Sequence, residues 1–194
     1  MAQRLVFLVL VSVATLQASG CSASLFKVKP VAELPPLADS AKHADAGGVT
    51  IRVAPLLTDE ESQDLFEANL PLSGVLPVRL ELRYESGLPV ETKQARFRLR
   101  DNQGREWKLL SPKQAISQIL KANGVFAYNP HSRKEFEKEF AAHALDLQTP
   151  VSTGERSHQG FLFFQSPTQR PVESVDKLTL TVERLTQTAT ITLD

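Results

Sequence analysis

The sequence predicts a mainly β domain: an antiparallel sandwich of about seven strands, with an inserted helical hairpin and one short N-terminal helix. In several short segments apolar residues alternate at a period of two, which is typical of strands with one buried face. The 194 residues are 42% hydrophobic, enough for one core of ordinary size. A formal net charge of zero with a pI near 6.9 is atypical of nucleic-acid-binding proteins, so we expect no nucleic-acid partner.

Residues 1–20 have the features of a lipoprotein signal peptide. A short basic start precedes an apolar segment at residues 5–16, which is shorter than the roughly 20 residues that a membrane-spanning helix needs. Small residues at positions 18–20 lead directly into Cys21. This order resembles the lipobox of bacterial lipoproteins, in which the cysteine is acylated and the peptide is cleaved ahead of it. The alternatives are an ordinary signal peptide with an incidental cysteine, or a buried structural thiol.

The lipobox resemblance implies a place in the cell. Acylated Cys21 would anchor the protein to a membrane of the cell envelope, and it is the one site residue that we assign. Ser22 follows it where inner-membrane lipoproteins have Asp, which implies the periplasmic face of the outer membrane. With the single cysteine acylated, no disulfide stabilises the domain.

A flexible tether is expected after the acylated cysteine, over residues 21–48. This stretch contains three prolines and the pair Gly47-Gly48, and it has no sustained periodicity. His43 and Asp45 fall within it. A disordered histidine is a poor catalytic group because nothing orients it, so neither residue is a candidate.

The strands are expected in a β-sandwich domain over residues 49–194. Alternating apolar residues fall in six segments, which begin at Val49, Val78, Ala95, Gly160, Leu178 and Ala189. A seventh strand, at residues 104–109, would pair with its predecessor across a turn at residues 101–104. Charged residues between the apolar positions, such as Arg79 and Glu81, are expected to face water. Seven short antiparallel strands favour an immunoglobulin-like sandwich.

Three helix starts carry a capping box, in which a Ser or Thr side chain and a Glu or Gln three residues later satisfy free backbone N–H groups. They are Thr58 with Glu61, Ser111 with Gln114, and Ser132 with Glu135. The first helix should end near Asn69, and the second should run over residues 112–122. The third should run from residue 133 to about Leu147. The helical insertion at residues 111–147 is far longer than an ordinary connection, and such insertions often carry function.

Several short motifs resemble segments found in a known group of proteins. They are Phe66-Glu67-Ala68-Asn69-Leu70, Gly74-Val75-Leu76-Pro77-Val78, Glu85-Ser86-Gly87, Thr153-Gly154-Glu155 and Gly160-Phe161-Leu162-Phe163-Phe164. Together they are similar to poorly characterised bacterial envelope lipoproteins with an immunoglobulin-like domain. The resemblance covers about residues 49–185 and departs at Tyr84, where such proteins tend to have Asn. It implies a fold and a compartment but no catalytic residues.

The predicted third helix carries the spacing of a candidate metal site. His131, Glu135, Glu139 and His143 recur every four residues, a spacing that could direct several ligands at one ion. If Ser132 caps the helix, however, His131 lies outside it. His143 then lies at the boundary of the buried face, so we expect no metal and no cofactor.

Neither of two further polar groups is assigned a role. His158 shares a predicted loop with Ser157 and Glu155, but three polar residues in a turn define no catalytic triad without an oxyanion hole. The row of Arg96, Arg98 and Arg100 could meet an acidic partner or lipid headgroups. We favour pairing of this row with Glu81 and Glu85 on a neighbouring strand.

We therefore expect a lipid-anchored, noncatalytic envelope protein that acts as a binding or assembly module. Its helical insertion and its edge strands would contact an envelope protein partner. Two alternatives stay open. One is a periplasmic cell-wall or lipid hydrolase with an unrecognised site. The other is a small-ligand carrier, which would require an apolar cavity.

Overall fold

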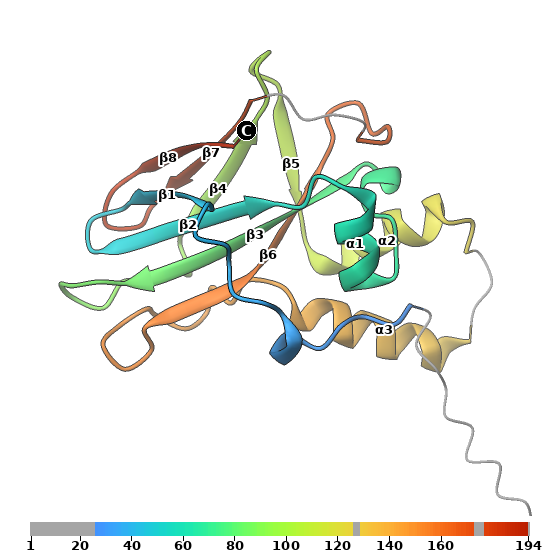
Figure 1. Cartoon of the computed structure of the whole chain (residues 1–194), viewed down its shortest axis with the longest axis horizontal. Helices are drawn as coiled ribbons and strands as arrows, with labels where there is room; N and C mark the ends of the chain where they lie inside the picture. The colour runs from blue at the N-terminus through green and yellow to red at the C-terminus, as the bar shows by residue number, and fades with distance from the viewer. Residues whose placement is uncertain (1–25, 126–128, 173–176, 194) are drawn as a thin grey trace, which may run out of the picture.

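The computed structural model describes residues 26–125, 129–172 and 177–193. Within them the chain is mainly β, as predicted. Eight antiparallel strands form one nearly closed sheet, and three α-helices lie together beside it (Figure 1). The strand order β1-β2-β3-β6-β5-β4-β7-β8 is continuous, and the first and last strands approach each other. This pairing does not support the predicted immunoglobulin-like sandwich of seven strands. The predicted signal peptide and Cys21 lie outside the described residues.

The six segments predicted from alternation are all strands, and so is the seventh, which was predicted from a turn. The strands are β1 (Lys42–Asp45), β2 (Val49–Pro55), β3 (Val75–Tyr84), β4 (Arg96–Arg100), β5 (Glu106–Leu110), β6 (Ser157–Gln165), β7 (Leu178–Glu183) and β8 (Ala189–Leu193). The predicted pairing of β4 with β5 is confirmed. The strand that was not predicted is β1, which pairs with β2. Its one apolar residue is Ala44, so alternation could not reveal it.

The α-helices are α1 (Asp59–Phe66), α2 (Pro112–Ala122) and α3 (Pro130–Ala142). The capping boxes predicted at Thr58 and Ser111 both form. The third prediction is wrong, because the Asn129 side chain caps α3 and a proline occupies the first helical position. Asn is as good an N-cap as Ser, and proline is favoured directly after it, so this start prevails over Ser132. None of the helices in the described residues is long and apolar enough to cross a membrane.

Two helices end earlier than predicted. Helix α1 stops at Phe66, where Glu67 adopts the left-handed conformation with φ 49°, and the short 3-10 helix η2 (Pro71–Ser73) follows. Helix α3 stops before His143. The chain then crosses β6, with an isolated bridge between Ala144 and Phe161. The helical insertion is therefore a shorter pair of helices than residues 111–147 suggested.

The segment expected to be a flexible tether is folded from Phe26 onward. Val28 and Leu37 are buried, and the Lys29 N–H donates to a carbonyl of α1 at 2.8 Å. A 3-10 turn, η1 (Val31–Glu33), and then β1 follow. The predicted domain boundary at residue 49 therefore falls inside the folded part of the chain.

The sheet has a core on each side. Apolar side chains on its inner face form one cluster, and those on the outer face beneath the helices form another. Strand β6 contributes to both, because Leu162 and Phe164 belong to the inner cluster while Phe161 and Phe163 belong to the outer one. A strand buried on both faces reads as a continuous apolar run, as this one does. The Phe140 ring of α3 stacks on Phe163 with centroids 4.6 Å apart.

Candidate functional site

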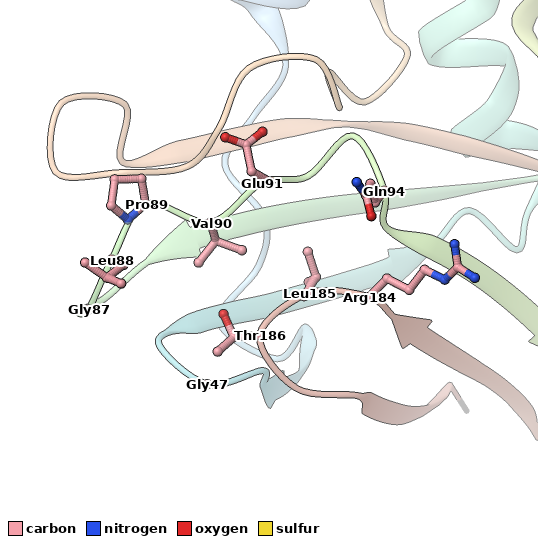
Figure 2. A pocket seen from close by; sticks show the side chains of 10 residues that line it. All are labelled: Gly47, Gly87, Leu88, Pro89, Val90, Glu91, Gln94, Arg184, Leu185 and Thr186. Atoms are coloured by element: carbon pink, nitrogen blue, oxygen red, sulfur yellow. The ribbon is translucent and has the colours of Figure 1, made fainter.

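A pocket of about 500 Å³ lies at one end of the sheet, where the connections β1–β2, β3–β4 and β7–β8 come together (Figure 2). We call it the loop-end pocket. It is lined by Gly47, Gly87, Leu88, Pro89, Val90, Glu91, Gln94, Arg184, Leu185 and Thr186. Ligand-binding pockets commonly have volumes of about 300–1,000 Å³, so this one is large enough to receive a side chain or a small molecule.

Backbone contacts between neighbouring turns hold the loop-end pocket in shape. The carbonyl oxygen of Gly48 accepts from the N–H groups of Glu85 at 2.9 Å and Ser86 at 3.3 Å. Gly48 has φ +94°, and a Cβ there would lie 2.3 Å from the Ser86 carbonyl oxygen, so only glycine fits. Val90 and Val151 exchange backbone hydrogen bonds of 2.9 and 3.1 Å, which fix the far side of the β3–β4 loop.

The rim of the loop-end pocket exposes a large apolar side chain. Leu88 is 84% exposed. Figure 2 shows Val90 and Leu185 pointing into the space between the loops, whereas the Glu91 carboxylate points away from it. Single exposed leucines are common on protein surfaces, but Leu88 extends an apolar lining that already exists. This end of the sheet therefore offers a surface suited to an apolar side chain of a partner.

A second pocket, of about 270 Å³, lies between the N-terminal segment, α1 and the outer surface of β2 and β3. We call it the Arg79 pocket. It is lined by Lys29, Pro35, Pro36, Leu37, Ala38, Ala54, Pro55, Leu56, Glu61, Asp64, Leu65 and Arg79. Most of these side chains are apolar, so the pocket has the composition of a small-ligand site.

Arg79 is the buried charge of this pocket, at 7% exposure. Its Nη2 donates to Oε1 of Gln159 at 3.2 Å, and its Nε has no hydrogen-bond partner among the residues that the structure describes. The neighbouring carboxylate of Glu81 accepts instead from Arg52 at 2.8 Å and from Gln159 at 3.4 Å. Burial lowers the pKa of the Arg79 guanidinium, and the nearby charge of Glu81 opposes that shift. Arg79 was expected to face water, and that expectation is wrong because the N-terminal segment and the helices cover this surface.

The four candidate metal ligands are not brought together. His131 and Glu135 are exposed on α3, whereas His143 is buried just beyond its end. The Nε2 of His143 lies 2.7 Å from the carbonyl oxygen of Lys29, to which it donates. Burial lowers the pKa of His143, the hydrogen bond to Lys29 raises it, and the charge of Arg79 lowers it again. Across residues 26–125, 129–172 and 177–193, no group of three acidic, His or Cys side chains could hold a metal ion.

His158 lies in a strand, not in the predicted loop. It is buried on β6, and its Nδ1 lies 3.2 Å from the carbonyl oxygen of Asp146. Ser157 is the adjacent residue of the same strand, so its side chain points to the opposite face. Glu155 is exposed in the turn before the strand. The three residues therefore form no shared site.

Two arginines of the row on β4, Arg98 and Arg100, are paired, but with other partners than predicted. Arg98 lies 3.8 Å from Glu183 on β7, and Arg100 lies 3.5 Å from Glu106 on β5. The prediction of pairing with Glu81 was wrong because β3 is not a neighbour of β4 in the sheet. Glu85, the other predicted partner, lies 3.6 Å from Arg83 on β3. The pairs on β4 are exposed and contribute little to stability.

Sequence reasoning missed both Arg79 and Leu88. One signal could have revealed the burial of Arg79. The apolar run of β6 indicates a strand buried on both faces, and the segments that cover β6 can also cover the strand beside it. Nothing in the sequence marks Leu88, because its exposure depends on how three turns meet.

Both pockets are built from segments far apart in the sequence. No protein-family model, no curated protein and no solved structure matches this chain.

Proposed function

We propose that this protein is a lipid-anchored, noncatalytic module of the bacterial cell envelope that binds an envelope protein through the loop-end pocket. One observation carries the proposal. The described chain enters the fold beside α3, where the Phe26 ring packs edge-on against Phe136 with centroids 5.1 Å apart. The turns of the loop-end pocket lie at the opposite end of the molecule (Figure 1).

The length of chain before Phe26 limits how far the domain can stand from a lipid anchor. Five residue steps separate Cys21 from Phe26, and a fully extended chain spans at most about 3.5 Å per residue, or roughly 18 Å in all. An acylated Cys21 would therefore keep the helical end of the domain close to the bilayer. The loop-end pocket would then face away from the membrane, where a partner can reach it.

The compartment is part of the same proposal. Cys21 and Ser22 follow an apolar segment and small residues, as in lipoproteins that are sorted to the outer membrane. The periplasmic face of that membrane is therefore the place we assign. The resemblance of several motifs to those of poorly characterised bacterial envelope lipoproteins favours the same compartment.

The chemistry of the loop-end pocket favours a protein partner. Leu88 projects from the rim, and Val90 and Leu185 line the interior with apolar surface. Arg184 and Gln94 supply polar groups at the same site. An apolar centre with a polar surround is the usual anatomy of a protein interface.

A crosslinking experiment tests the partner. A photo-crosslinking amino acid at position 94, an exposed residue of the same pocket, should give one dominant protein adduct in intact cells. Adding Leu88→Asp to this chain should abolish capture of that protein without changing the melting temperature. Leu72→Asp is the matched control, because Leu72 is also exposed, at 48%, but lies outside this pocket. Equal capture by both Asp variants would refute the role of the loop-end pocket.

Metabolic labelling tests the anchor. A radioactive fatty acid should label the unaltered protein and not Cys21→Ser, because Cys21 supplies the only thiol in the chain. Label that persists in the variant would contradict lipidation at this residue.

A further inference from the structure

We propose that the Arg79 pocket binds a small aliphatic carboxylate, with the Arg79 guanidinium holding the carboxylate and the apolar lining holding the hydrocarbon body. The site is distinct from the loop-end pocket and does not depend on the lipid anchor or on a protein partner. It would supply the apolar cavity that a small-ligand carrier requires.

The first argument concerns unused hydrogen-bond donors. A guanidinium carries five N–H donors in a fixed planar fork. In the described part of the chain, Arg79 donates to one acceptor, Oε1 of Gln159, and its Nε has no partner. A buried donor without an acceptor is unfavourable, particularly on a charged group. Arg79 lines the pocket, and a carboxylate bound there would supply the guanidinium with charged acceptor oxygens.

The second argument is that the protein's own carboxylates around the pocket are already engaged. Asp64 pairs with Lys29 at 2.7 Å. Glu61 accepts the backbone N–H groups of Leu57 and Thr58 at 3.0 and 3.2 Å as part of the α1 cap. Neither acid hydrogen-bonds to Arg79 among the interactions of the described residues. The acceptor that completes Arg79 would therefore come from a ligand.

The third argument concerns the size and the charge of the ligand. Leu37 and Leu56 are buried at the pocket, and Pro35, Pro55 and Leu65 add further apolar surface. A volume of about 270 Å³ is at the lower end of ordinary ligand pockets. The carboxylates of Glu61 and Asp64 at the same pocket would repel a doubly charged group such as a phosphate monoester. A short hydrocarbon chain with a single negative charge fits these conditions.

The test compares two probes that differ in charge at one end. Octanoate and its neutral counterpart octanamide are titrated by calorimetry and by NMR into the full chain carrying Cys21→Ser, so that no acyl chain of the protein competes. We expect octanoate to bind about tenfold more tightly than octanamide or better, because a hydrogen bond to a charged group is worth roughly that factor.

Three variants locate the binding. Arg79→Gln should weaken octanoate binding by about tenfold and leave octanamide unchanged. Ala54→Phe, which fills the pocket from β2, should weaken both probes. Arg83→Gln is the matched control, because Arg83 lies on the same strand but is exposed and outside the pocket. It should change neither affinity.

The proposal is overturned if octanoate fails to bind at millimolar concentration, if the two probes bind equally, or if Arg79→Gln keeps the preference for octanoate. Melting temperatures of all variants are compared first. If Arg79→Gln does not fold, two other measurements decide the question. They are the difference in affinity between octanoate and octanamide for the unaltered pocket, and the loss of that difference in Ala54→Phe. None of these outcomes depends on Leu88 or on acylation, so a failure here is distinct from a failure of the proposed function.

Discussion

The backbone of Leu145 crosses strand β6 directly against Gly160. A Cβ added to Gly160 would lie 2.5 Å from both the Cα and the N of Leu145, far inside van der Waals contact. The crossing is fixed by two hydrogen bonds, from the Phe161 N–H to the His143 carbonyl oxygen at 2.7 Å and from the Leu145 N–H to the Phe161 carbonyl oxygen at 3.1 Å. Gly160 thus allows the chain that leaves α3 to lie on the sheet.

Gly160→Ala should therefore destabilise the fold. The neighbour in the way is backbone and cannot rotate aside, so we expect a loss of about 1–3 kcal/mol or more in the free energy of unfolding. Urea denaturation followed by circular dichroism measures it. Gly154→Ala is the control, since its Cβ would meet only the Ser152 side chain at 3.9 Å. Equal stability of the two variants would contradict the close crossing.

Stability should fall as the pH drops through the range in which histidine titrates. In the folded protein the pKa of His143 is lowered, mainly by burial, whereas in the unfolded chain it is near 6.5. At a pH between these two pKa values, the unfolded chain binds more protons than the folded protein. The stabilisation is therefore fully present above pH 6.5 and is lost as the pH falls below it. Urea denaturation at pH 7.5 and at pH 5.5 should give different midpoints. The free energy of unfolding should change by up to about 1.4 kcal/mol per pH unit.

Two variants test whether His143 causes this pH dependence of stability. His143→Gln keeps a donor for the Lys29 carbonyl oxygen but cannot titrate, so the difference between the two midpoints should shrink. His131→Gln, at an exposed position of α3, should leave it unchanged. The same pH dependence in His143→Gln as in the unaltered protein would show that another group is responsible.

Removal of the N-terminal segment should weaken the domain. A chain that begins at residue 49 lacks β1 and the buried side chains of Val28 and Leu37. Each buried side chain of this size contributes about 1.5–3 kcal/mol, so this chain should melt well below one that begins at residue 26. Equal melting temperatures would mean that the segment contributes nothing to the fold, as the tether prediction required.

The sequence was most informative where one local rule decides the structure. Alternation located six strands because each has one face on the inner core, and a turn sequence located the seventh. The side chains of Thr58 and Ser111 located two helix starts because an N-cap acts within four residues. It failed where the outcome depends on distant segments. Strand β1 forms because β2 offers it an edge, and Ala44 alone carries no pattern.

The candidate site was less predictable than the fold. Arg79 alternates with apolar residues on β3 and so was expected to face water. It lies against the N-terminal segment, which has no periodicity, and against α1, which follows another strand. His131 and His143 are spaced like ligands along the sequence, but one is exposed in the first turn of α3 and the other is buried beyond the end of that helix.

The orientation of the domain on a membrane shows whether the loop-end pocket faces away from the lipid, as its role in partner binding requires. The protein acylated at Cys21 has no other thiol, so Leu88→Cys and Lys138→Cys each introduce one labelling site, at the loop-end pocket and on α3. Each variant is labelled with a fluorophore and bound to phosphatidylethanolamine and phosphatidylglycerol vesicles that contain nitroxide-labelled headgroups. We expect strong quenching at position 138 and weak quenching at position 88, because the helical end of the domain would lie at the bilayer. Equal quenching, or stronger quenching at position 88, would contradict this orientation.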